Sequence, residues 1–110
     1  MEFSYPLNSK VVFFNRDDSF NSHMPDGSEA VSWENKYAFA GFNAFDIPIA
    51  ISDGLNEKGL SLSALWLTGT EYEEVSPDSD PTKVIELFDL RSWILGNFDT
   101  LDQLEKLLKV

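Results

Sequence analysis

A short polar segment between two apolar runs constrains the fold of this chain most. The segment is Asp53–Leu60; Ile47–Ser52 precedes it, and the apolar run Leu60–Leu67 follows. Two β-type runs around a short loop that contains Gly and Asn predict a β-hairpin. Asn56 and Gly59 suit the reversal, because Asn hydrogen-bonds nearby backbone groups and Gly adopts positive φ without a Cβ clash. We expect the paired strands at about residues 46–53 and 59–68.

Further elements lie on both sides of this hairpin. Lys10–Asn15 and Lys36–Phe42 are two more candidate strands. The intervening Asn15–Asn35 is rich in Asp, Asn, Pro, Gly and Ser, which predicts a loop. Gly69–Ser79 is acidic and polar and predicts a second, solvated loop.

A helix is expected to begin after the acidic loop. Asp80 is a candidate N-cap, and Pro81 suits the first helical position. Apolar residues then recur at steps of three and four, which favours an amphipathic helix that ends at Gly96-Asn97. Arg91 interrupts the apolar face, so it needs a partner or a route to water. Thr100 and Gln103 match a capping box for a second short helix.

Strands followed by a helical pair define an α+β chain, which we treat as one segment over residues 1–110. The 19 acidic and 8 basic residues give a formal net charge of −11. This charge repels phosphate backbones and anionic membranes, so we expect neither nucleic-acid nor membrane binding. High solubility is the simpler meaning of the acidity.

The sequence also bears on location and cofactors. No apolar run reaches the roughly 18 residues of a membrane span, and no signal peptide is visible in Met1–Phe20. We therefore expect a cytoplasmic protein, although a leader upstream of Met1 is compatible with the sequence. The chain has no Cys, which excludes disulfides and thiolate metal sites within it. Neither a cofactor nor a metal motif is evident.

Four segments in the same order resemble the choloylglycine hydrolase family, which includes conjugated bile salt hydrolases and penicillin V acylases. The most specific is the block DGLNEKGLS at 53–61, followed by an apolar strand. The other three are Met1–Phe3, Lys36–Gly41 and Leu90–Phe98. The resemblance covers nearly all 110 residues, but these match only about the first third of such an enzyme.

The resemblance implies an N-terminal-nucleophile amide hydrolase with an αββα sandwich, of which this chain would supply part of one sheet and one helical layer. Family members carry a catalytic Cys at the mature N-terminus and an Arg-x-Met-Asp motif. This chain starts at the position of that Met and lacks the nucleophile. The family's later Asn and Arg site residues are expected beyond Val110. The implied partner is a small-molecule amide substrate.

The resemblance also implies site residues. Glu2 occupies the position of the family's catalytic Asp; a carboxylate there could orient an N-terminal amine that acts as base. Trp66 stands at a substrate-contact position, where Trp leans away from bile salts and toward aromatic or aliphatic acyl groups. The segments that border the acyl pocket also contain Phe3, Phe42, Phe45 and Ile47. Glu2 could equally be an exposed terminal residue, and each aromatic residue could equally be core.

Other polar residues are weaker candidates. His23 is the one histidine and lies in a polar loop, where a solvated surface role is the simpler interpretation. A catalytic triad with Asp17, Asp18 or Asp26 would require an unsupported guess about the fold. Glu71, Glu73 and Glu74 lack the spacing of a calcium loop.

Two hypotheses of different class follow. The chain is a segment of a linear-amide hydrolase, inactive alone, or it is a short non-catalytic protein that binds a partner or an apolar ligand. An in-frame Arg two codons before Met1, with a Cys about seventeen positions before it, would support the first. Unpaired strand edges and an uncovered sheet face predict that the isolated chain self-associates or is loosely packed.

Overall fold

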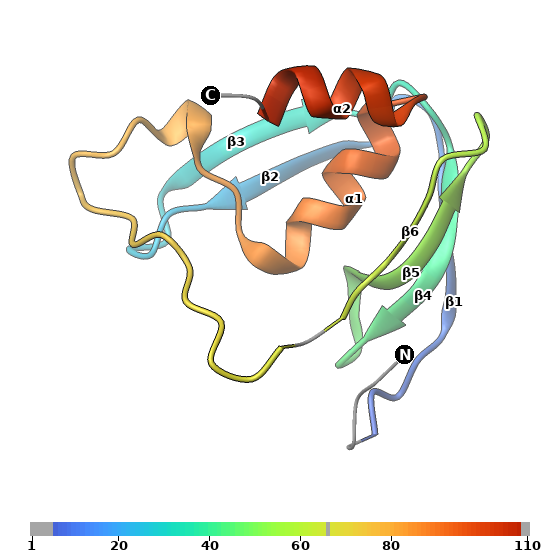
Figure 1. The fold of residues 1–110 in the computed structure, drawn as a ribbon, viewed down its shortest axis with the longest axis horizontal. Helices are drawn as coiled ribbons and strands as arrows, with labels where there is room; N and C mark the ends of the chain where they lie inside the picture. Colours follow the sequence, from blue (N-terminus) through green and yellow to red (C-terminus); the bar gives the residue numbers. More distant parts are fainter. Residues whose placement is uncertain (1–5, 66, 109–110) are drawn as a thin grey trace.

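Antiparallel strands followed by two α-helices confirm the α+β class (Figure 1). The structure is a computed structural model that describes residues 6–65 and 67–108. The elements in chain order are β1 (Val11–Phe14), β2 (Ser19–His23), β3 (Glu29–Glu34), β4 (Phe39–Ala44), β5 (Ile47–Asn56), β6 (Ser61–Ser63), the 3-10 helix η1 (Pro81–Lys83), α1 (Leu87–Asn97) and α2 (Leu101–Leu108).

The strands form a four-stranded antiparallel sheet in the order β1-β4-β5-β6 and a separate β2–β3 hairpin. Phe42 of β4 pairs with Val11 of β1 on one side and with Asp53 of β5 on the other. The ladder between β4 and β5 shifts register around Asn43. Such irregularities bend the strands and re-aim side chains near the end of a sheet.

The core lies between the sheet and α1. Phe39, Ile51 and Leu95 are almost completely buried there, and partly buried side chains pack around them. The ring of Phe14 lies 4.9 Å from that of Phe39, measured between centroids, and 5.4 Å from that of Phe20. Aromatic contacts therefore connect the core of the sheet to the β2–β3 hairpin.

The other face of the sheet is apolar and exposed. Both helices lie on one side of the sheet, and no described element covers its other side (Figure 1). The alternation of the strands places four large side chains on this outer face, each at least half exposed: Val11, Phe13, Phe42 and Leu55. An apolar sheet face normally packs against a second layer.

The loop predicted for Asn15–Asn35 is wrong, because this segment contains β2 and β3. Pro25, Asp26 and Gly27 mark only the tight turn between these strands, where Gly27 has φ +88° and Asp26 accepts hydrogen bonds from Ser28. The many turn-forming residues of this segment favoured one long loop over two strands joined by a turn. A structureless loop of that length would be unusual inside a small domain.

The helix predicted to begin at Pro81 also needs correction. Asp80 does act as an N-cap and accepts a hydrogen bond from Thr82 N, but it caps η1, and α1 begins at Leu87. The backbone at Val84 is extended instead, and its carbonyl accepts a hydrogen bond from Val31 N of β3. This non-local bond interrupts the helix that local propensity favours.

The central hairpin is confirmed with shifted boundaries. Asp53, expected in the turn, pairs within the sheet, and β5 continues to Asn56. Asn56 forms the turn, since its Oδ1 accepts hydrogen bonds from the backbone N–H groups of Lys58 and Leu60, and Gly59 has φ +91°. The expected strand Lys36–Phe42 likewise begins only at Phe39, because Lys36 N and Tyr37 N donate to Gly96 O at the end of α1.

The C-terminal elements agree with expectation. Helix α1 ends at Asn97, and Gln103 N donates to Thr100 Oγ1 at 3.3 Å, which caps α2. The side-chain oxygen of Gln103 accepts a hydrogen bond from Asp99 N rather than from Thr100 N, which is a variation on the capping box. No helix among residues 6–65 and 67–108 is long and apolar enough to cross a membrane.

Candidate functional site

A two-residue turn between β4 and β5 positions one wall of the candidate site. Phe45 and Asp46 both have positive φ, 59° and 58°, and Ala44 pairs with Ile47 across them. This is the geometry of a type I′ hairpin turn, which favours Asn and Gly. A bulky residue in this conformation is strained and needs support from its surroundings. The Phe45 ring contacts that of Phe88 on α1, with centroids 5.9 Å apart at 64°.

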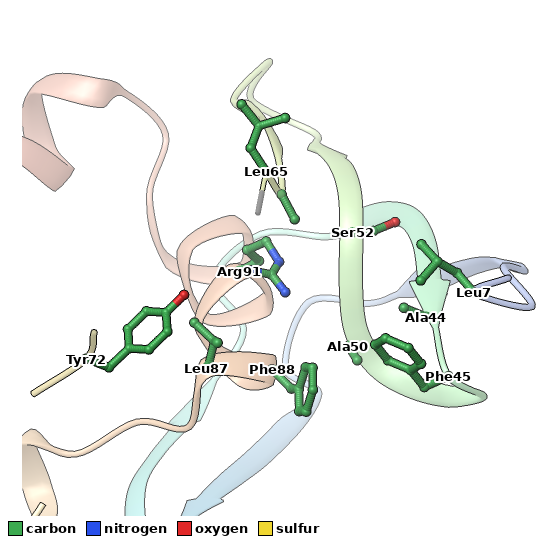
Figure 2. A pocket seen from close by; sticks show the side chains of 11 residues that line it. Leu7, Ala44, Phe45, Ala50, Ser52, Leu65, Tyr72, Leu87, Phe88 and Arg91 are labelled. Atoms are coloured by element: carbon green, nitrogen blue, oxygen red, sulfur yellow. The ribbon is translucent and has the colours of Figure 1, made fainter. Parts of the chain in front are cut away.

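Phe45 and Phe88 lie at one end of a cavity of about 260 Å³ between α1 and the β4–β5 end of the sheet (Figure 2). Its size is just below the roughly 300–1,000 Å³ of typical small-molecule sites. The walls are mostly apolar, and the polar side chains among them are Ser52, Tyr72 and Arg91. The complete lining is Leu7, Ala44, Phe45, Ala50, Ser52, Ala64, Leu65, Tyr72, Leu87, Phe88 and Arg91.

Arg91 is the cationic residue in this lining. It lies on α1, is partly buried, and donates a hydrogen bond from Nε to the carbonyl oxygen of Ile51. Burial lowers the pKa of Arg91 from its ordinary value, while the neighbouring Tyr72 and Asp53 act in the opposite direction. The hydrogen bond to Ile51 O explains how the apolar stripe of α1, which faces the sheet, tolerates an arginine.

The structure separates the candidate acyl-pocket residues. Phe45 lines the cavity, and Ile47, 38% exposed, follows the same turn. Phe42 instead lies in a shallow hollow of the outer sheet face, together with Val11 and Asp53. The predicted site residues Glu2, Phe3 and Trp66 lie outside the described residues.

The weaker catalytic candidates among the aspartates have structural roles in turns. Asp26 and Asp18 accept hydrogen bonds in turns, from Ser28 and from Asn15 N. His23 ends β2, close to Glu86, whose pKa is raised chiefly by burial and next by Asp89, with His23 acting in the opposite direction. Within the described part of the chain, no three His, Asp or Glu side chains form a group able to hold a metal ion.

One ion pair supports the hairpin from outside. Arg16 makes two hydrogen bonds of 2.6 Å to the carboxylate of Glu57, and Glu57 also accepts from Ala38 N at 3.0 Å. The Arg16 bonds, followed by that of Ala38, lower the pKa of Glu57 to about 2. The Arg16 bonds tie the hairpin turn to the segment between β1 and β2, and the Ala38 bond ties it to the segment that leads into β4.

Sequence reasoning missed most of the cavity. Ser52, Tyr72, Leu87 and Phe88 come from three separate segments and carry no joint motif. Two lining residues gave a signal: Arg91, as a cation within an apolar helical stripe, and Phe45, through the family resemblance. The Phe45 turn gave none, since Phe-Asp is an unfavourable sequence for a type I′ turn.

A sheet with helices on one face and an exposed apolar second face is part of a layered α+β fold. The chain matches, over residues 1–110, the sequence profile of the linear amide C-N hydrolases, choloylglycine hydrolase family. It therefore belongs to the choloylglycine hydrolase family.

Two relatives give the range of this similarity. The chain is 34% identical to penicillin V acylase of Pectobacterium atrosepticum over 89 residues, which are 76% of this chain and 23% of that protein. It is 28% identical over 111 aligned residues to a bile salt hydrolase/transferase of Clostridium perfringens, covering 99% of this chain and 32% of that protein. The chain thus spans about a quarter to a third of the length of these relatives.

Solved structures show the same fold. Penicillin V acylase from Agrobacterium tumefaciens superposes with a TM-score of 0.79 over 93% of this chain and 30% of that one, at 24% identity. A variant of conjugated bile acid hydrolase from Clostridium perfringens gives a TM-score of 0.68 at 25% identity, over 94% of this chain and 30% of the other. The N-terminal-nucleophile hydrolase fold expected from the sequence is confirmed.

Proposed function

We propose that these 110 residues form one segment of a linear-amide hydrolase of the penicillin V acylase or conjugated bile salt hydrolase type, and that they hydrolyse no amide by themselves. The observation that carries the proposal is the family match over residues 1–110. Inactivity follows from the chemistry. The family's acyl-enzyme requires a Cys thiolate, and the chain contains no Cys.

Within the intact enzyme, the segment contributes to substrate binding. Glu2 orients the nucleophile region, and Trp66 with Phe3, Phe45 and Ile47 forms the wall around the acyl group. Phe42 joins that wall only if the pocket extends to the outer sheet face. Support comes from Phe45, which is held in a strained turn beside an apolar cavity. A small apolar amide is the expected substrate, and no cofactor is required.

A chimera tests this proposal. The matching segment of the Pectobacterium penicillin V acylase is replaced by this chain, so that the relative supplies the nucleophile and the remaining layers. We expect the chimera to hydrolyse penicillin V, and the isolated chain to release no acid from penicillin V or glycocholate above a buffer blank. A folded chimera without activity, or turnover by the isolated chain that survives repeated purification, would contradict the proposal.

We also propose that the isolated chain self-associates. The exposed outer face, with Val11, Phe13, Phe42 and Leu55, favours this and equally favours the alternative function of a non-catalytic binding protein. The two functions differ in the chimera experiment, since only a hydrolase segment restores turnover. A cytoplasmic location stays a prediction from the sequence.

A further inference from the structure

We propose that the cavity between α1 and the β4–β5 end of the sheet binds a small apolar carboxylate, with Arg91 as the anion-binding group. This inference rests on the proposed function, because Phe45 borders both this cavity and the proposed acyl wall, and it adds to that wall an anion-binding group, Arg91. The site consists of residues that the described structure already brings together.

The first support is the position of the guanidinium. Figure 2 shows Arg91 extending from α1 toward β5, with Leu65 above it, Phe88 below it and Tyr72 to one side. Nε is held by the carbonyl oxygen of Ile51, which fixes the plane of the guanidinium. The N–H groups of both Nη atoms are then available to donate hydrogen bonds to a carboxylate.

The second support is that no carboxylate of the described residues forms an ion pair with Arg91, although Asp53 and Tyr72 lie close enough to oppose the lowering of its pKa by burial. The ion pairs of residues 6–65 and 67–108 are Lys10–Asp46 and Arg16–Glu57, and neither includes Arg91. A partly buried guanidinium costs desolvation energy, which an anion with good geometry offsets. The other basic side chains of the described structure do not line this cavity.

The third support is the character of the walls. Leu7, Leu65, Leu87 and the two Phe rings are apolar, and Tyr72 adds a hydroxyl group; the hydroxyl of Ser52 donates to Phe42 O instead. A carboxylate at Arg91 with a short alkyl or aryl tail toward Phe45 and Phe88 satisfies both parts of the cavity. The volume of about 260 Å³ favours such a tail over a sterol.

Octanoate and its uncharged analogue octanol are the probes. Their binding to the 110-residue chain is measured by calorimetry, and the site is located from methyl NMR shifts. We expect octanoate to bind about tenfold more tightly than octanol, the scale of one charge-assisted hydrogen bond. The methyl groups of Leu65 and Leu87 should shift, while those of Val11 and Leu55 on the outer face should not.

Variants separate the cation from the walls. Arg91→Met should abolish the preference for octanoate, and Arg91→Lys should restore part of it. Arg16→Met is the matched control, because it removes an arginine far from the cavity and should leave the preference intact. Phe88→Ala should weaken the binding of octanoate and of octanol to the same extent. If Arg91→Met fails to fold, Phe88→Ala tests whether both ligands occupy this cavity.

Equal binding of octanoate and octanol by the wild-type chain would overturn the proposal, as would an octanoate preference that persists in Arg91→Met. Ligand shifts centred on Val11 and Leu55 would also overturn it, because they would place the bound molecule on the outer sheet face. None of these results bears on amide hydrolysis, which the chimera tests separately.

Discussion

Both faces of the four-stranded sheet carry large apolar side chains, but only those on the inner face are buried. On the inner face, Phe39 and Ile51 are buried against Leu95 of α1. On the outer face, Phe13 is 76% and Leu55 54% exposed. Alternation along a strand normally gives one apolar and one polar face when a single layer covers it. An apolar pattern on both faces indicates that the sheet is built to lie between two layers.

This difference agrees with the coverage of the relatives. The chain spans 30% of each of the two solved structures compared, and the helical layer on the inner face belongs to that share. Among the described residues, the outer face is left without a covering layer. Stability should depend on the inner face, and association on the outer one.

The largest effect is expected from a matched pair of truncations in β5. Ile51→Ala removes a side chain with no exposed area and should lower the free energy of unfolding by about 2–5 kcal/mol. Leu55→Ala, four residues further along the same strand, should change it by less than about 0.5 kcal/mol. Urea unfolding measures both, and equal losses would show that the outer face is already covered in the isolated chain.

A polar residue at the end of β5 provides the second test of the inner face. Asn56 is 3% exposed, and its Nδ2 donates to the carbonyl oxygens of Leu95 and Phe98 at 2.9 and 2.6 Å. Asn56→Ala leaves these groups and the turn without partners, so we expect a loss of about 2–3 kcal/mol. Asn21→Ala, at an exposed strand position, is the control and should be nearly neutral in the same urea titration.

Trp66 extends the comparison from folding to binding. The sequence pattern predicts Trp66 as core or pocket wall, and Trp66 itself lies outside the described residues. In the chimera, Trp66→Ala should lower kcat/KM for penicillin V about ten- to a hundredfold, equivalent to roughly 1–3 kcal/mol of transition-state binding. Trp66→Asn should lose the same substrate and gain, if anything, on bile salts. If activity falls only as far as the thermal melt does, Trp66 is core.

The smallest effect concerns the ion pair outside the hairpin. The pKa of Glu57 lies near 2 in the fold against an ordinary 4.5, so its charge stabilises the folded chain above pH 4.5. That contribution is lost as the pH falls from 4.5 toward 2. Arg16→Met should flatten the decline of Tm over this window, whereas Lys36→Met, at another exposed cation, should not. Parallel melting curves for wild type and Arg16→Met would contradict this account of Glu57.

What the sequence predicted correctly depends on local chemistry. Asn56 and Gly59 form the expected turn, and Thr100 caps the expected helix, because the responsible contacts join residues a few positions apart. The β2–β3 hairpin and the late start of α1 were missed. The hairpin pairs locally, from Ser19–Glu34 to His23–Glu29, but the turn-forming residues along it favoured a single loop. The late start of α1 depends instead on bonds that cross more than fifty residues, such as Val31 N to Val84 O and Glu86 N to Ser22 Oγ.

The candidate site follows the same rule. Phe45 was expected near a pocket and lines one, and Arg91 was expected to need a partner and has Ile51 O. Tyr72 and Ser52 could not be found from sequence, because only the folded sheet and the segment that follows β6 bring them into the same cavity lining as Arg91. The spacing of these residues along the sequence does not predict that they line one cavity.

Sedimentation velocity of the isolated chain over a range of concentrations tests the central claim most directly. If the outer sheet face is built for a second layer, the wild-type chain should associate as concentration rises. A Phe13→Ser, Leu55→Ser double variant should stay monomeric and keep its far-UV spectrum. A strictly monomeric wild-type chain with a sharp cooperative melt would contradict the account, since it would show that this face needs no cover.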